Sequence, residues 1–392
     1  PIWFGVNDRT ENGDTNNAWC VNAKILNDRG IDIWKIWCER AREKGISPWI
    51  SMRMNDSHYV DRDYKVHRNE NFWWEHPEWW RLPQTKEGRL TGPKKGRELD
   101  FSHPEVFDHA MKLVEEILER WDAEGIELDW MRQPWCLTCG TEAEQSFVLT
   151  TFMRQVRALA DAAAARRGHP VGVCVRLPSV LAGARLIGYD VETWAKEGLM
   201  DIVIPTSAYS AVEYDYGVAD WRKALVGAVR PVKLVFGTDV CIYNHAVRRF
   251  EVHADLAFLR GWVANASEGD GLSLFNAPYY PEKARKAVYS GALAPELVEH
   301  GSRRYPITYH EWMPNKAMED RQLFRRNVGE GAEFHLSVKK YPHDQTIVLV
   351  MGFDLKDEPA PKVTLNGVKP EEPARTIKPS CIVPDPSGFV TN

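Results

Sequence analysis

The stretch EGIELDWMRQP, residues 124–134, decides the fold of this chain. Its apolar residues Ile126, Leu128 and Trp130 alternate with Glu127 and Asp129, so a β-strand places both carboxylates on one face. Burying a carboxylate costs free energy unless a partner or a function compensates it, so this pair indicates a functional site. The pattern predicts an inner strand of a parallel α/β barrel, with the site at the carboxyl end of that strand.

Strand-like and helix-like patterns alternate on both sides of this stretch. The strand-like segments are residues 2–7, 46–54, 124–134, 171–178, 201–209, 233–239 and 271–280. Helical spacing separates them, for example around residues 250–264, and this alternation predicts parallel βαβ units. A closed (β/α)₈ TIM-type barrel needs eight strands, so we expect a first βα unit missing from this chain or an unrecognised eighth strand. The alternative is an open doubly wound sheet, which the lack of a Gly-rich phosphate loop after any strand disfavours.

Capping residues predict where two of the helices begin and end. Ser102 and Glu105 have the spacing of a capping box, and so do Thr141 and Glu144. Gly168 follows a long helical pattern and is expected to end the second helix, because glycine readily adopts the left-handed conformation there.

The pattern of predicted secondary structure changes from about Tyr305. Short β-type runs such as EFHLSVKKY, TIVLVMGF and KVTLNG follow one another without long helical patterns. We therefore expect a barrel catalytic domain over residues 1–300 and a small β-sandwich-like domain over residues 301–392, truncated at its Pro-rich end.

Composition excludes some classes of partner. Lys and Arg number 50 against 55 Asp and Glu, a net charge of -5, so neither a nucleic-acid surface nor a polybasic membrane surface is expected. No apolar run is long enough to span a bilayer. The 16 Trp include several in FWWEHPEWW, residues 72–80, which either stack on sugar rings or fill core positions.

The cysteines predict reduced thiols and no metal site. Seven is an odd number, and Cys174 and Cys241 fall inside predicted strands, which favours buried thiols over a disulfide framework. Cys136 and Cys139 form one CxxC without a second pair or a nearby His at zinc spacing. We therefore expect no metal and no other cofactor.

Polar residues end each of the predicted strands, among them Asn7, Arg53, Asp129, Arg176 and Asp239. Because the carboxyl ends of barrel strands meet at one face, these groups are expected to form a ring of hydrogen-bond donors and acceptors. Such a ring fits a ligand that is rich in hydroxyl groups.

Two resemblances to known families extend this interpretation. GIELDWM resembles the barrel strand of family 18 chitinases, but Met131 stands at the position of their acid Glu, so their acid chemistry does not carry over. The order of SMRMND, HPEWW, LDFSHPEV, GIELDWMRQP and RRYPITYHEW is similar to that in bacterial glycosyl-hydrolase-like barrels, the family-10-like glycoside hydrolases. The second resemblance covers most of the chain. It implies carbohydrate hydrolysis and a secreted or periplasmic location, without defining the substrate.

Glycoside hydrolysis generally uses two carboxyl groups, one protonated and one ionised. The catalytic candidates are Asp129 with Asp239 as the first pair, and Asp56 as an alternative acid or base beside His58. The substrate-binding candidates are Arg53, Asn55, His58, Glu127, Arg132, Trp135, Arg176, Tyr209, Asn276 and Tyr280.

The catalytic candidates also have structural alternatives. Asp129 fits a buried ion-pair network with Arg53 and Arg176, and Asp239 fits a helix cap or turn. Glu127 lies one step deeper on the strand than Asp129 and is expected to orient it or to pair with an arginine.

Three functions are consistent with these residues. The leading hypothesis is a glycoside hydrolase acting on a poly- or oligosaccharide, with carbohydrate as the only expected partner. The second is a non-catalytic carbohydrate-binding barrel, which is favoured by Met131 standing where family 18 chitinases carry their acid Glu. The third is a metal-dependent hydrolase or deacetylase that uses Asp56, His58 and Asp239.

Overall fold

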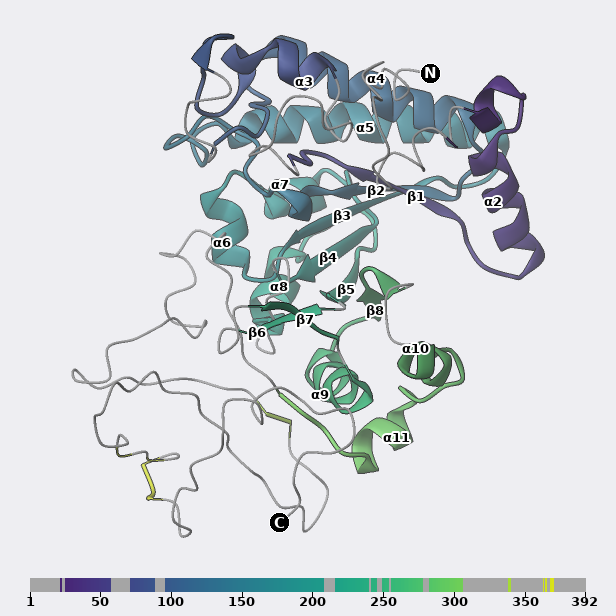
Figure 1. The fold of residues 1–392 in the computed structure, drawn as a ribbon, viewed down its shortest axis with the longest axis vertical. Helices are drawn as coiled ribbons and strands as arrows, with labels where there is room; N and C mark the ends of the chain where they lie inside the picture. Colours follow the sequence, from purple (N-terminus) through teal and green to yellow (C-terminus); the bar gives the residue numbers. More distant parts are fainter. Residues whose placement is uncertain are drawn as a thin grey trace. The chain divides into compact units, whose positions relative to one another are not determined.

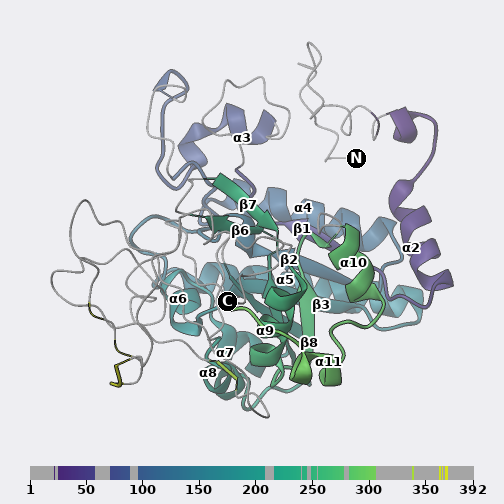
Figure 2. The same cartoon turned by 60° about the horizontal axis from the view of Figure 1, so that its bottom comes forward.

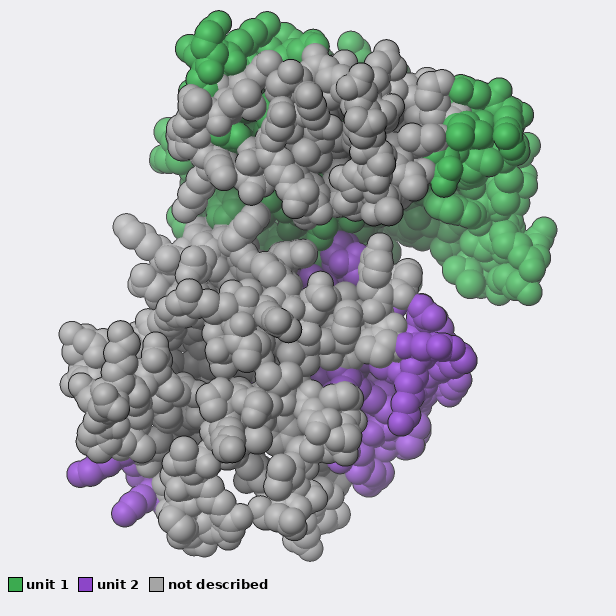
Figure 3. Space-filling model, in the orientation of Figure 1, with its two compact units in different colours: residues 1–206, 217–235 green, residues 207–216, 236–392 purple. Residues whose placement is uncertain are grey.

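The computed structural model describes most of the region between residues 25 and 305. The described residues are 22, 25–57, 71–88, 96–207, 216–239, 241–244, 249–253, 255–277, 282–305, 338–339, 362, 364 and 367–369. The chain divides into two compact units, residues 1–206 with 217–235 and residues 207–216 with 236–392 (Figure 3). The first predicted strand and nearly all of the predicted C-terminal β domain lie outside the described residues, so the domain boundary near residue 300 stays a prediction.

The first unit is built on parallel strands that lie side by side in chain order (Figure 1). They are β1 Trp49–Arg53, β2 Gly125–Asp129, β3 Gly172–Pro178, β4 Ile202–Thr206 and the beginning of β5 Lys233–Thr238. A doubly wound sheet reverses its strand order at a switch point, and these strands show no reversal. The described strands therefore form part of a barrel wall, as predicted, and closure of a barrel lies outside what they show.

Helices alternate with these strands along the chain. Their bounds are α2 Ile33–Glu43, α3 Asn71–Glu75, η3 Pro77–Trp79, α4 Pro104–Arg120, η5 Trp130–Arg132, α5 Ser146–Arg167, α6 Leu181–Leu186, α7 Val191–Lys196 and α8 Val218–Ala224. The two long helices, α4 and α5, pack against each other beside the sheet (Figure 1). Ile126, Leu128, Val173 and Val175 are completely buried, which confirms the predicted apolar face of the strands.

The predicted helix starts are wrong, whereas the predicted stop is confirmed. Neither α4 nor α5 has a side-chain hydrogen bond at its N-cap, which is His103 in α4 and Gln145 in α5. Ser102 is held instead in a turn, where its N–H donates to Asp100 Oδ1 at 2.9 Å. Capping boxes form only when the first turn begins at the hydroxyl residue, and both helices begin later. Gly168 ends α5 with a φ of 76°.

Among the described residues, the second unit contains the end of β5, three further strands and three helices. These are β6 Cys241–Asn244, β7 Arg249–His253, α9 Leu256–Ala266, β8 Gly271–Leu274, α10 Glu282–Tyr289 and α11 Pro295–His300. β8 lies next to β5, and α9 contacts both α10 and α11 (Figure 2). No helix among the described residues is both long and apolar enough to cross a membrane.

The helix predicted around residues 250–264 begins later than expected. Residues 249–253 form β7, which pairs antiparallel with β6. The helix starts after Asp255, whose carboxylate accepts a hydrogen bond from Phe258 N at 2.8 Å. Backbone pairing with β6 therefore overrides the helical spacing of the first predicted turn.

Most of the tryptophans of FWWEHPEWW are core residues. Trp73, Trp74 and Trp80 are at most 4% exposed and form one cluster. The Trp73 indole donates to Arg97 O at 2.8 Å, and the Trp80 indole donates to Trp73 O at 3.0 Å. These three rings are therefore committed to packing rather than to a sugar.

Candidate functional site

Three rows of side chains cross β1, β2 and β3 on the face opposite the apolar core. Strand pairing sets the rows, which from the amino to the carboxyl ends are Trp49, Gly125, Gly172, then Ser51, Glu127, Cys174, then Arg53, Asp129, Arg176. The predicted parity of Glu127 and Asp129 is therefore confirmed. The last row lies at the carboxyl ends of the strands, where the chemistry of parallel α/β folds is found.

The Trp49 ring fills the amino-terminal row. A Cβ atom added to Gly125 would lie 2.3 Å from this ring, and one added to Gly172 would lie 2.4 Å from it. The two glycines therefore make room for the indole, which occupies the inner face of the sheet below Glu127. Nothing in the local sequence pattern indicated this contact, because Trp49 lies far from both glycines along the chain.

Asp129 is the most buried carboxylate of the site. It is 1% exposed, and its Oδ1 accepts from Arg176 Nη1 at 2.8 Å and from Met131 N at 3.0 Å. Its Oδ2 is buried and has no hydrogen-bond partner among the described residues. A guanidinium group at this distance stabilises the negative charge of a carboxylate. The structural alternative, a buried ion pair with Arg176, is therefore present, and Oδ2 is still available to a ligand atom.

Glu127 lies one row deeper and has a different environment. Its Oε1 accepts a hydrogen bond from Ser51 Oγ at 2.6 Å. Burial raises the pKa of Glu127, and the charge of Asp129 adds to this, while the Ser51 hydrogen bond and Arg176 only partly oppose it. Two carboxyl groups on one strand face thus differ in environment, as they do when one serves as acid and the other as base.

Two more arginines lie at the same end of the strands. Arg53, at the end of β1, donates through Nη1 to Asp56 Oδ2 at 2.8 Å, and its side chain is 47% exposed. Arg132 ends η5, which contacts both β1 and β3. The pKa of Arg132 is lowered by burial and next by Arg53, despite the opposing charges of Asp56 and Asp129.

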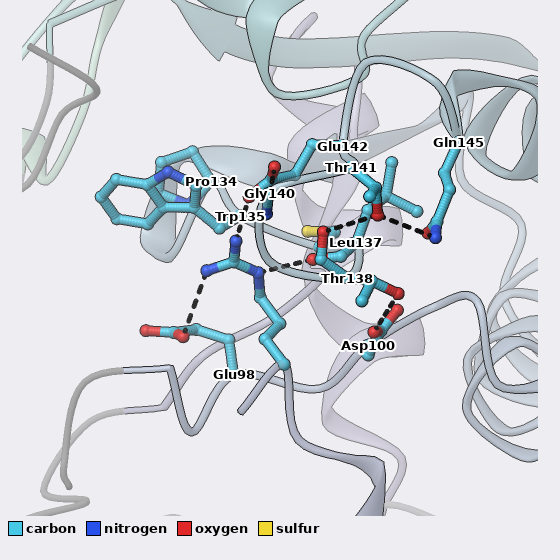
Figure 4. A network of polar contacts seen from close by, with 12 residues as sticks. Glu98, Asp100, Pro134, Trp135, Leu137, Thr138, Gly140, Thr141, Glu142 and Gln145 are labelled. Atoms are coloured by element: carbon cyan, nitrogen blue, oxygen red, sulfur yellow. Dashed lines mark hydrogen bonds and ion pairs between the residues drawn. The ribbon is translucent and has the colours of Figure 1, made fainter. Parts of the chain in front are cut away.

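A buried polar network braces the loops beside this end of the sheet (Figure 4). Arg81, which is 7% exposed, donates to Leu137 O at 2.7 Å and forms ion pairs with Glu142 and Glu98. Nearby, Thr138 donates to Asp100 Oδ2 at 2.8 Å. No local sequence pattern predicts this network, because its members lie in separate loops and carry no shared motif.

Asn55 and Trp135 lie in the same group of loops beside the carboxyl ends of the strands. Asn55 is 4% exposed, and its Nδ2 donates to Leu99 O at 2.9 Å and to Trp135 O at 3.1 Å, while its Oδ1 accepts from Leu99 N. Its amide therefore joins two loops, and its role in substrate binding stays a prediction. Trp135 is half-buried.

The other predicted site residues are distributed as follows. His58, Tyr209 and Tyr280 lie outside the described residues. Asp239 and Asn276 belong to the second unit, where Asp239 is 3% exposed and Asn276 has a φ of 54°. The pairing of Asp129 with Asp239 therefore stays a prediction.

The cysteines that the structure describes are free thiols. Cys38, Cys136 and Cys174 are buried and Cys139 is exposed. Burial raises the pKa of Cys136 to about 12, so its thiolate is strongly disfavoured. Across the described ranges, no three His, Cys, Asp or Glu side chains are grouped to hold a metal ion.

No protein-family model and no curated protein sequence matches the chain. Alpha-L-fucosidase isoenzyme 2 from Paenibacillus thiaminolyticus is a similar solved structure, with a TM-score of 0.41 and 15% identity over 68% of this chain and 40% of that chain. A GH36 alpha-galactosidase from Geobacillus stearothermophilus has a TM-score of 0.33 and 16% identity over 69% of this chain and 34% of that chain. A family GH18 chitinase from Chromobacterium violaceum has a TM-score of 0.29 and 11% identity over 54% of this chain and 35% of that chain. The chain thus spans less than half the length of these glycoside hydrolases. Similarity at this level carries no argument about activity, and the resemblance to family-10-like barrels stays a prediction.

Proposed function

We propose that the protein is a glycoside hydrolase that acts on a poly- or oligosaccharide at the carboxyl ends of β1, β2 and β3. One observation carries the proposal, the hydrogen bonding of the Asp129 carboxylate. Its Oδ1 is held by Arg176 Nη1 and Met131 N, while its buried Oδ2 has no hydrogen-bond partner among the described residues. A carboxylate held in this way by a cation and a backbone N–H is positioned to serve as the ionised member of a hydrolytic pair.

The second carboxyl group has three candidates. Glu127 has a raised pKa, which suits a proton donor, and it shares the strand face of Asp129. At roughly 3.3 Å per residue, two positions along a strand separate the Cα atoms of Glu127 and Asp129 by about 6.6 Å. Asp56 and Asp239 are the other candidates. In this proposal the protonated group assists the leaving oxygen, and the Asp129 carboxylate acts on the anomeric centre or on the attacking water.

The proposal is tested by comparing wild type with Asp129→Asn on a panel of polysaccharides and aryl glycosides, with sugar release as the readout. We expect wild type to cleave at least one glycan, and Asp129→Asn to lower that rate by at least about 10²-fold. Asp161→Asn is the matched control, because Asp161 lies on α5 and pairs with Arg157 and Arg230. Equal activity in all three proteins would refute a catalytic role for Asp129.

A second function is favoured by a separate observation. Met131, at the position of the family 18 acid, is 5% exposed, and its thioether carries no proton to donate. A barrel that binds carbohydrate without cleaving it would fit this arrangement. Wild-type protein that binds a glycan of the panel and cleaves none would establish this second function over the first.

A further inference from the structure

Three arginines lie at the charged end of β1, β2 and β3. Arg53 and Arg176 flank Asp129 in register, and Arg132 follows three positions after the end of β2 in η5. These three guanidinium groups lie beside two carboxylates, Asp56 and Asp129, in a chain whose net charge is -5. All three belong to the first unit.

Arg53 is the member that a ligand can reach. Its side chain is 47% exposed, whereas the Arg176 side chain is 4% exposed and is bound to Asp129. Among the described residues only Nη1 of Arg53 is engaged, by Asp56. A guanidinium group carries five N–H donors in a planar fork, so Arg53 keeps an edge that can bind two oxygens at once.

Arg53 has a like-charged neighbour. The pKa of Arg132 is lowered mainly by burial and next by the charge of Arg53, against the opposing charges of Asp56 and Asp129. A ligand anion placed between these arginines would relieve their mutual repulsion. Arginine is also the side chain best suited to planar oxyanions, because its donors match the spacing of two carboxylate or sulfate oxygens.

We infer that this site takes an acidic saccharide, whose carboxylate or sulfate group binds the free edge of the Arg53 guanidinium beside Asp129. The inference rests on the proposed function for the location of the site and adds the class of the sugar. Arg53 then determines specificity, while the carboxyl groups act on the glycosidic bond. A neutral saccharide would leave the arginine edge solvated and would gain none of this interaction.

Matched glycan pairs test the inference, with binding to the full chain measured by calorimetry. One pair is an oligogalacturonate and its methyl ester, and the other is a sulfated carrageenan oligosaccharide and its desulfated form. In at least one pair we expect the acidic member to bind about tenfold more tightly than the neutral member, the size of one charge-assisted contact. The preference should shrink as salt is added. The pair that shows it distinguishes a uronate from a sulfate ester.

Variants of Arg53 and its partner locate the effect. Arg53→Gln should abolish the acidic preference, Arg53→Lys should retain part of it, and Asp56→Asn should strengthen it by releasing a further donor of Arg53. Arg154→Gln is the matched control, because Arg154 is 49% exposed and is bound to a carboxylate, Glu197. Thermal unfolding of each variant checks that it folds. If Arg53→Gln fails to fold, Asp56→Asn still tests the inference independently.

The outcomes separate this inference from the proposed function. No acidic preference in either pair, or equal losses in Arg53→Gln and Arg154→Gln, would overturn the inference. Hydrolysis of neutral glycans alone would leave the glycosidase proposal standing and refute the acidic substrate. Acidic glycans that bind through Arg53 and are never cleaved would support the inference and refute the glycosidase proposal.

Discussion

Arg176 Nη1 lies 2.8 Å from Asp129 Oδ1, and the two residues are register partners on neighbouring strands. Both are at most 3% exposed, so the ion pair is almost removed from water. A buried pair of this kind loses most when one partner is removed, because the other charge is left uncompensated.

Replacing Arg176 should therefore destabilise the protein strongly. We expect Arg176→Met to lower the free energy of unfolding by about 3–5 kcal/mol, the usual cost of breaking a buried pair. Arg176→Met with Asp129→Asn should recover part of that loss, since no buried charge then remains. Denaturant unfolding of the two single variants and the double variant measures the coupling. Strictly additive effects would show that the pair contributes no interaction energy.

Glu127 should make the stability of the protein depend on pH in the acidic range. Its folded-state pKa is raised by burial above the ordinary value of 4.5. Its contribution to stability is therefore fully present below pH 4.5 and is lost as the pH rises through the folded-state pKa. Glu127→Gln keeps a neutral side chain throughout, so its stability relative to wild type should increase as the pH rises.

Unfolding free energies of wild type and Glu127→Gln over a pH series measure this difference. Glu119→Gln, on the exposed side of α4, serves as the control for loss of a carboxyl group. A constant difference between Glu127→Gln and wild type at every pH would contradict the raised pKa.

His169 and Asp122 should stabilise the protein between about pH 4 and pH 6.5. His169 Nδ1 lies 2.9 Å from Pro170 O and Nε2 lies 2.7 Å from Asp122 Oδ1, so only the protonated ring can donate to both. These contacts raise the pKa of His169. The pKa of Asp122 is lowered, because the His169 hydrogen bond and Arg42 outweigh the opposing effect of burial.

The sign of the pH dependence follows from these directions. The His169 contribution is present below its ordinary value of 6.5 and is lost as the pH rises through its raised pKa. The Asp122 contribution is present above 3.8 and is lost as the pH falls through its lowered pKa. Because the pair is largely exposed, His169→Gln should cost at most about 0.5 kcal/mol at pH 6. Thermal unfolding in wild type, His169→Gln and Asp122→Asn measures it, and a larger loss at pH 9 than at pH 6 would contradict it.

Gly125 should tolerate no side chain while Trp49 is present. An added Cβ atom would lie 2.3 Å from the Trp49 ring, so Gly125→Ala forces the indole or the strand to move. We expect a loss of about 1–3 kcal/mol, as for other overpacked cores. In a Trp49→Leu background the same change should cost clearly less. Denaturant unfolding of wild type, the two single variants and the double variant measures the two costs. An equal cost of Gly125→Ala in both backgrounds would exclude the clash with Trp49 as the cause.

The alternation of strands and helices, and the face on which each side chain of the central strand lies, follow from local sequence patterns. Period-2 spacing is a property of the extended backbone, so Glu127 and Asp129 had to share a face once the stretch formed a strand. Trp130, one of the apolar residues that alternate with these carboxylates in the sequence, is completely buried. The stop at Gly168 was predictable because it depends on one residue and its own dihedral angles.

The contacts across the sheet depend on how the strands pair and could not be predicted from local patterns. Strand register brings Arg176 to Asp129 and lays Trp49 over Gly125, and neither contact follows from a local pattern. The failed capping boxes and the late start of α9 have the same origin, because turns and strand pairing compete with local helix signals. Local geometry therefore set the candidate carboxylates of the site, whereas their partners and charge environment depend on long-range pairing of the backbone.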